Sequence, residues 1–225
     1  MKRLLPFLLI LLAVSGPVSG LDWQAVDAEI AFTWQYNAQL DAGADGKYPS
    51  ILMFNLGAAF FADWDGEPGG LYFRPGGWFS WNTEDVYNGI ARHSEEAEIG
   101  HMKVLGLMAD APFGYVFKTG SVDIGVQGGP SLYLRFPLWT AQEGTAVPAD
   151  FWKAYYGGAQ FLYIGIASWA AIPVSEILDF LPGLRFYYPI SNLWTAAPGA
   201  HNIQIALTVS LRFNNVFSSS EKKQP

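Results

Sequence analysis

The segment from Ile203 to Phe213, IQIALTVSLRF, alternates without interruption between large apolar residues and residues that are polar or small. Successive side chains of a β-strand point to opposite faces, so this period of two places all the large apolar side chains on one face. A tilted strand of about 9 to 11 residues crosses the hydrocarbon core of a bilayer. The segment therefore predicts a strand with one face suited to lipid and the other, which carries Gln204 and Arg212, suited to a polar interior.

The same alternation occurs in segments 26–36 and 121–136, where charged and amide side chains occupy the second face. Weaker alternation marks five more segments, in which small residues such as Gly57 and Gly165 occupy the second face and suit a narrow barrel interior. The expected strands lie at about 26–36, 50–61, 71–81, 98–117, 121–136, 155–171, 184–194 and 203–213.

Composition indicates that something other than water covers the surface. Hydrophobic residues make up 51% of the chain, charged residues make up 15% and there are no cysteines, whereas a typical soluble domain has about 25% charged residues. A helical membrane span needs about 20 consecutive apolar residues, and the best candidate, Phe161 to Leu178, is interrupted by Pro173, Ser175 and Glu176. Closed barrels are the other structure that satisfies every backbone hydrogen bond in lipid. We therefore expect an all-β fold, a closed antiparallel transmembrane β-barrel of about eight strands.

The two ends of the chain differ from the rest. Residues 1–20 combine Lys2 and Arg3 with an apolar run and small residues before Gly20, as in a secretory signal peptide. The expected domains are a signal peptide at 1–20, a barrel at 21–217 and a polar tail at 218–225. Removal of Lys2 and Arg3 takes the formal net charge from −7 to about −9, which disfavours nucleic acid as a partner.

The connections between the expected strands are unequal. Starting from a periplasmic N-terminus, the outer loops fall at about 37–49, 82–97, 137–154 and 195–202, and the periplasmic turns at about 62–70, 118–120 and 172–183. The last of these turns is long for its side, and residues 174–180 within it are expected to form a short interfacial helix.

Tryptophan and tyrosine concentrate at both membrane interfaces of such barrels. The expected strand ends coincide with most of the tryptophans in this sequence. The expected interface anchors are Trp34, Trp78, Trp81, Trp139, Trp152, Trp169 and Trp194.

Charged side chains on the second face of the strands are candidates for the barrel lumen. One interpretation is that they form a charged pathway or a binding site. The other is that they form a network of ion pairs that fills a narrow interior, and this one is favoured because buried charges require partners. The candidates are Asp27, Glu29, Arg74, Lys103, Asp123, Arg135, Arg185 and Arg212.

No motif in the chain predicts catalysis, a metal site or a cofactor. The histidines are His93, His101 and His201, and the adjacent Ser94 does not make a triad with His93, because loop neighbours seldom face one another. The acidic run within 82–98 lacks the spacing of a calcium loop. Glycine pairs such as Gly128-Gly129 predict bulges or tight inner packing rather than a phosphate loop.

The signal peptide, the loop pattern and the final strand ending in Leu211-Arg212-Phe213 resemble the small eight-stranded outer-membrane barrels of diderm bacteria, including the OmpW-like group. The resemblance covers the whole mature chain and rests on architecture. It implies residence in outer-membrane lipid, assembly by the barrel-assembly machinery through a terminal aromatic signal, here Phe213 or Phe217, and a lumen that admits small hydrophobic molecules. Twelve residues follow Phe213, so the resemblance implies that machinery only if it tolerates an internal signal.

The favoured function is therefore a non-enzymatic integral outer-membrane barrel, whose loops contact an external ligand or whose narrow lumen admits small molecules. A general porin is disfavoured, because a water-filled channel needs roughly 16 strands. A lipid-modifying barrel enzyme and a soluble periplasmic β-sandwich stay open as alternatives.

Overall fold

The computed structural model describes residues 20–36, 51–64, 69–87, 90–93, 102–140, 149–195 and 202–217. Residues 1–19 of the predicted signal peptide and the predicted tail at 218–225 lie outside this part of the chain. So do His101, His201 and much of the predicted outer loops.

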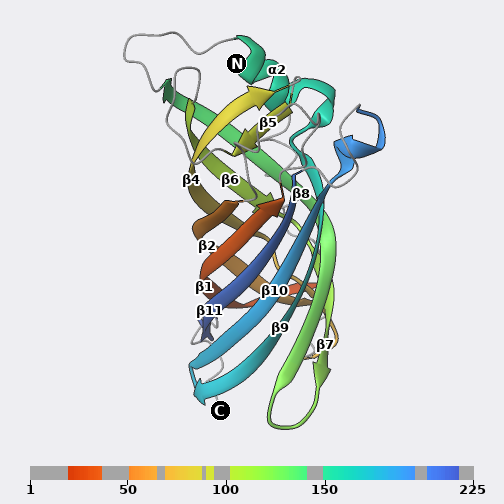
Figure 1. Ribbon diagram of the computed structural model, residues 1–225. Helices are drawn as coiled ribbons and strands as arrows, with labels where there is room; N and C mark the ends of the chain where they lie inside the picture. The colour runs from red at the N-terminus through yellow and green to blue at the C-terminus, as the bar shows by residue number, and fades with distance from the viewer. Residues whose placement is uncertain are drawn as a thin grey trace, which may run out of the picture.

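The predicted closed antiparallel barrel is confirmed: the strands form one sheet that closes into a ring of 8 strands (Figure 1). The strands are β1 (Leu21–Tyr36), β2 (Ile51–Trp64), β3 (Leu71–Phe73), β4 (Gly76–Tyr87), β5 (Ile90–His93), β6 (Met102–Asp110), β7 (Phe113–Lys118), β8 (Asp123–Thr140), β9 (Leu162–Ser175), β10 (Leu178–Pro189) and β11 (Ile203–Asn214).

The ring runs β1-β2-β4-β6-β8-β9-β10-β11, and β11 pairs with β1 to close it. Two of its strands are divided by a proline. Strand β3 continues β4 beyond Pro75, and β7 continues β6 beyond Pro112. Backbone bonds cross these breaks, since the Phe60 amide donates to the Pro75 carbonyl and the Arg74 amide to the Pro112 carbonyl. Closure therefore leaves the ring without a free edge.

The two ends of the barrel differ. One end, the short-turn end, has the connections 65–70, 119–122 and 176–177, and both β1 and β11 have their outer chain ends there. The other, the long-loop end, has longer connections that include α2 (Ala149–Tyr156) and the 3₁₀ helices η1 (Gly157–Ala159) and η2 (Ile190–Leu193) (Figure 1). No helix in the described part of the chain is long and apolar enough to cross a membrane.

Several predicted boundaries were wrong. The predicted outer loop at 82–97 contains the end of β4 and the whole of β5, so strand pairing continues beyond the expected end at residue 81. Residues 155–161 are not strand, because α2 and η1 occupy 155–159 and a turn follows at 160–161, and residues 190–193 form η2 rather than the end of a strand. The expected long turn at 172–183 with an interfacial helix is instead a tight turn at Glu176-Ile177 between β9 and β10. Pro182 is tolerated within β10 because it lies where the β9–β10 register leaves two residues unpaired.

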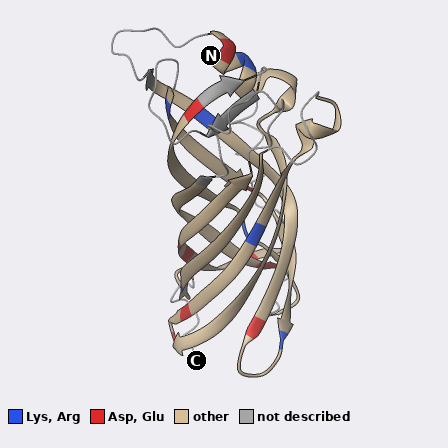
Figure 2. Ribbon diagram, viewed as in Figure 1, with Lys and Arg blue, Asp and Glu red and all other residues tan. Residues whose placement is uncertain are grey.

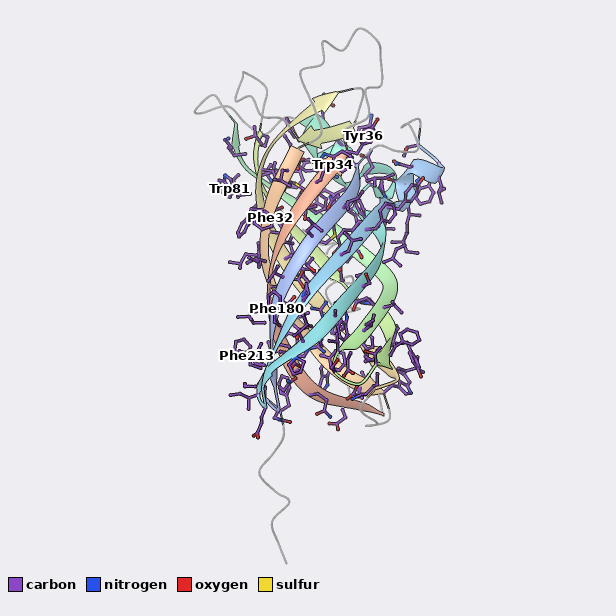
Figure 3. All side chains as sticks on the ribbon, turned by 60° about the horizontal axis from the view of Figure 1, so that its bottom comes forward. Phe32, Trp34, Tyr36, Trp81, Phe180 and Phe213 are labelled. Atoms are coloured by element: carbon purple, nitrogen blue, oxygen red, sulfur yellow. The ribbon has the colours of Figure 1, made fainter. Side chains whose placement is uncertain are left out.

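The outer face of the ring is apolar. Side chains such as Leu52, Leu56 and Ile166 expose more than half of their surface, and few positions along the strands are charged (Figure 2). Figure 3 shows Phe32, Trp34, Tyr36 and Trp81 on the wall near the long-loop end and Phe180 and Phe213 near the short-turn end. This is a hydrophobic belt with an aromatic girdle at each end, as a bilayer requires.

Leu56 offers a test of the belt, because it is 58% exposed and pairs with Ile30 in the middle of the wall. Replacing it with arginine places a charge in hydrocarbon, and we expect Leu56→Arg to lower the free energy of unfolding in phospholipid vesicles by about 2 to 4 kcal/mol. The matched control is Leu193→Arg in η2, because Leu193 is 71% exposed at the long-loop end. This variant should change the free energy of unfolding little. Equal effects would contradict a lipid-facing belt at Leu56.

Candidate functional site in the barrel lumen

The centre of the lumen contains a buried ion-pair network built on β1. Asp27 is wholly buried and accepts hydrogen bonds from two arginines: Arg74 Nε at 2.6 Å and Arg212 Nε at 2.7 Å, with Arg212 Nη2 at 3.0 Å. Arg74 lies at the β3–β4 break and Arg212 on β11. Asp27 therefore links its own strand to elements on both sides of it in the ring.

Glu29, two residues along the same inward face, repeats this role. Its Oε2 atom accepts hydrogen bonds from Arg185 Nη2 at 2.6 Å, Ser210 Oγ at 2.8 Å and Arg74 Nη2 at 3.2 Å. Arg74 thus bridges Asp27 and Glu29. Ser210 is the register partner of Glu29 on the neighbouring strand β11, whereas Arg185 reaches Glu29 from β10, the strand beyond it.

Arg185 extends the network to the opposite wall. Its Nη1 atom lies 3.7 Å from Asp110 Oδ2 on β6, and the Tyr187 hydroxyl donates to the same oxygen at 2.7 Å. The Arg185 guanidinium also lies 3.7 Å from the ring centre of Trp78, a cation–π contact. Three carboxylates thus face three guanidiniums, and pairing of this kind removes most of the cost of burying each charge.

An aromatic layer lies between this network and the short-turn end. Phe61 stacks on Tyr72 with ring centres 5.0 Å apart, and Trp169 packs edge-on against both rings. Arg212 covers Phe61 at 4.1 Å and Trp169 at 4.6 Å. The indole of Trp169 donates to the Tyr72 hydroxyl, which donates in turn to Gln127. The layer is therefore both apolar and hydrogen-bonded.

Glycines in the wall make room for these rings. A Cβ at Gly125 would overlap the indole of Trp169, and one at Gly106 would lie 2.8 Å from Tyr133 Cε2. In each pair an inward aromatic ring lies over a glycine of a neighbouring strand. A narrow barrel can hold large inward side chains only where the neighbouring wall position has no side chain of its own.

A second cluster lies at the long-loop end, where α2 closes the mouth. Phe151, Ala154 and Tyr155 of α2 form a core cluster with Met102 and Val104 of β6. Below this cluster, Arg135 lies 3.7 Å from a carboxylate oxygen of Glu84, and its guanidinium faces the Tyr155 ring at 4.6 Å. Burial, together with the Glu84 carboxylate, raises the pKa of Tyr155 well above its usual range. The phenol is therefore neutral at ordinary pH.

Little space is left along the axis. A cavity of about 300 Å³ lies at the short-turn end. Two others, beside Asp110 and beside Asn55, are about 10 Å³ each, close to the volume that one water needs. The middle of the barrel is packed with side chains rather than open.

The structure places most of the predicted lumen residues inside the wall. Asp123 lines the cavity at the short-turn end, 3.6 Å from Lys118. Lys103 faces outward, so its predicted lumen position was wrong: the inward positions of β6 are the even ones from Met102 onward, and Lys103 donates to Thr83 Oγ1 instead. The residues that lie buried in the lumen are Asp27, Glu29, Arg74, Arg135, Arg185 and Arg212.

The predicted interface anchors divide into two groups. Trp34, Trp81, Trp152 and Trp194 are each more than 40% exposed at the long-loop end or near it, as an anchor requires. Trp78 and Trp169 were wrongly predicted as anchors, because they lie on inward positions of β4 and β9 and are buried at 2% and 5% exposure. The side chain of Trp139 lies outside the described part of the chain.

Sequence reasoning missed several polar members of the lumen, and three of them belong to the ion-pair clusters. Asp110, Glu84 and Tyr187 were not predicted there, although each lies an even number of residues from an inward neighbour: Asp110 from Met108, Glu84 from Asn82 and Tyr187 from Arg185. Extending the alternation of each strand to its ends would have found them.

Known proteins show the same fold. No family model and no curated protein sequence matches the chain. Among solved structures, Neisserial surface protein A matches with a TM-score of 0.52 and 12% identity over 87% of this chain and 99% of that protein. Ail from Yersinia pestis and a major outer membrane protein from Thermus thermophilus match more weakly, each with a TM-score of 0.39, at 6% and 12% identity over 85% of this chain and 99% and 98% of theirs.

The chain has the fold of a small outer-membrane β-barrel. This fold and the lipid-facing belt agree with the predicted location in the outer membrane. The likeness is to small barrels in general, so membership of the OmpW-like group stays a prediction.

The ring-over-glycine contact predicts that Gly125→Ala destabilises the barrel by about 1 to 3 kcal/mol, because the new methyl group displaces Trp169. Gly77→Ala is the matched control, since its Cβ would meet nothing nearer than 3.6 Å. Urea unfolding in phospholipid vesicles measures both variants. The double variant Gly125→Ala/Trp169→Leu should regain part of the loss, and its failure to do so would place the strain elsewhere.

The network predicts a larger effect at Glu29. Glu29→Gln leaves Arg185 and Arg74 with one carboxylate fewer in a buried site, and we expect about 3 to 5 kcal/mol of lost stability. Glu29→Gln/Arg185→Gln should cost less than the sum of the two single variants, since it removes charges of both signs. Additive losses in urea unfolding would show that the pair is not coupled.

Proposed function

We propose that this protein is a non-enzymatic outer-membrane barrel that does not conduct along its axis and contacts an external ligand through its long-loop end. The observation that carries the proposal is the filled lumen. Between the short-turn cavity and α2, the axis is occupied in turn by the aromatic layer, the ion-pair network and the Arg135 cluster. Passage of small hydrophobic molecules, which the resemblance to the OmpW-like group implied, would have to displace all three.

The long-loop end supplies the exposed surface. On α2, Trp152 is 48% exposed and stacks on Tyr156. On the neighbouring segment Trp194 is 54% exposed, and its indole donates to the Gly158 carbonyl at 2.8 Å. This ordered surface is joined to the lumen through Tyr155 and Arg135. We propose that it faces the outside and that the short-turn end faces the periplasm.

Assembly fits the same proposal. Phe213 is the last outward aromatic residue of β11 at 43% exposure, and the Phe217 ring lies 6.3 Å from that of Phe60 on β2. We propose that one of these two residues forms the signal that the barrel-assembly machinery reads.

The proposal predicts no stepwise conductance when the protein is inserted in planar lipid bilayers. Tyr155→Ala removes the contact of α2 with Arg135 and should leave the bilayer equally silent, because the central network still fills the lumen. Conductance by the wild-type protein would contradict a closed barrel. Conductance by Tyr155→Ala alone would show that α2, rather than the network, closes it.

A further inference from the structure

The small cavity beside Asn55 lies in the middle of the lumen. Its volume is about 10 Å³, and its lining includes Asn55 of β2, Trp78 of β4 and Arg185 of β10. A cavity needs roughly 10 to 15 Å³ to hold a water molecule. This cavity therefore has room for one water and for nothing larger.

Two buried polar atoms of the cavity lining have no hydrogen-bond partner among the described residues. They are the indole Nε1 of Trp78 and the Oδ1 atom of Asn55. Both side chains are more than nine-tenths buried, at 2% and 7% exposure. The large majority of buried polar groups in folded proteins are paired with a protein group or with ordered water. The two atoms thus indicate a partner that the polypeptide does not supply.

The register of the wall brings these two atoms to the same place. Asn55 and Gly57 point inward from β2, and Gly57 lies opposite Trp78 on β4. The Trp78 ring covers Gly57, since a Cβ there would be 2.6 Å from Trp78 Cδ1, the ring atom bonded to Nε1. Alternate residues of a strand are about 7 Å apart. The Asn55 side chain and one bridging molecule can span that separation.

The bonding capacity of the two atoms defines the bridging molecule. The Trp78 N–H can only donate and the Asn55 carbonyl oxygen can only accept, so the molecule must accept one hydrogen bond and donate another. A metal cation cannot accept the indole hydrogen, and it would lie near the Arg185 guanidinium, which is 3.7 Å from the Trp78 ring centre. An anion would face the Asn55 oxygen. Water meets both demands within this volume.

We propose that one water molecule is bound at this site, where it accepts a hydrogen bond from Trp78 Nε1 and donates one to Asn55 Oδ1. Its bonds join β2 to β4 on the inner face and hold the indole in the orientation in which its ring meets Arg185. The water is thus a member of the polar network of the lumen. The inference does not depend on what the long-loop end contacts or on whether the barrel conducts.

The test uses the folded mature protein in two measurements. In a crystal structure that resolves ordered water, we expect one density peak about 2.7 to 3.2 Å from both Trp78 Nε1 and Asn55 Oδ1. In nuclear magnetic resonance spectra of the barrel in lipid nanodiscs, the Trp78 indole proton should give a cross-peak to the water signal. Trp78→Phe identifies that proton, because its resonance disappears from the spectrum.

Asn55→Leu nearly keeps the size of the side chain and removes the acceptor, and we expect it to abolish the cross-peak. Asn82→Leu is the matched control. Asn82 is also inward and 7% exposed, but it donates to Ser80 and to the Tyr133 hydroxyl and does not line this cavity. The control should keep the cross-peak, and heat-modifiable gel mobility checks that each variant has folded.

Absence of the density peak would overturn the proposal, even if Asn55→Leu failed to fold. A cross-peak that persists in Asn55→Leu would also overturn it, since the signal would then come through a protein hydroxyl such as that of Tyr187, which lines the same cavity. Loss of the cross-peak in Asn82→Leu as well would show a general loosening of the lumen and would count equally against the site.

Discussion

The structure depends on charge neutrality in the lumen. Asp27 and Glu29 project from β1 into a space too narrow for bulk water, so their charges must be matched by other strands. Arg74, Arg185 and Arg212 provide the match, and in doing so they tie the first strand of the ring to its last two and to the divided third strand. A change of register by one residue in any of these strands would turn a charge toward lipid. The network therefore stabilises one register of the closed ring as well as filling its centre.

The aromatic layers follow from the same shortage of space. A ring of 8 strands leaves room for little more than its own side chains, and this chain places Trp78, Tyr133 and Trp169 among them. Glycine at the facing wall positions allows each ring to lie flat, and the guanidiniums of the network then cover the exposed faces of the two indoles. Charged and aromatic layers thus share residues: Arg185 and Arg212 each complete an ion pair and a cation–π contact. A substitution in either layer therefore disturbs the contacts of the other.

The alternation of apolar and polar residues predicted the closed barrel and most of its strands, because a wall between lipid and a polar interior imposes a strict period of two. The same rule predicted the burial of Asp27 and Arg212. The rule failed where residue type was given more weight than the alternation along the strand. Trp169 was interpreted as an interface anchor from residue type. It lies six residues after the inward Tyr163 on β9, so the alternation of the strand points it inward as well. The expected turn at 172–183 was too long, since a sequence does not show that Pro173 and Pro182 are accommodated within paired strands. The partners of each charge could not be predicted at all: Arg185 meets Glu29 across 156 residues, and only the closed ring brings them together.

Filling the centre of the barrel moves any recognition to its two ends, which then differ in chemistry. At the long-loop end, α2 buries Tyr155 on Arg135 and leaves Trp152 outside, so the exposed surface is aromatic and held in place from below. At the short-turn end no helix of the described residues closes the mouth, and the last layer of the lumen forms the end of an acidic cavity instead. The difference follows from the connections: two-residue turns such as Glu176-Ile177 are too short to cover the opening, whereas the connection between β8 and β9 is long enough to contain a helix. The packed network thus separates an outer surface from an inner pocket, and a change at one end has no open path to the other.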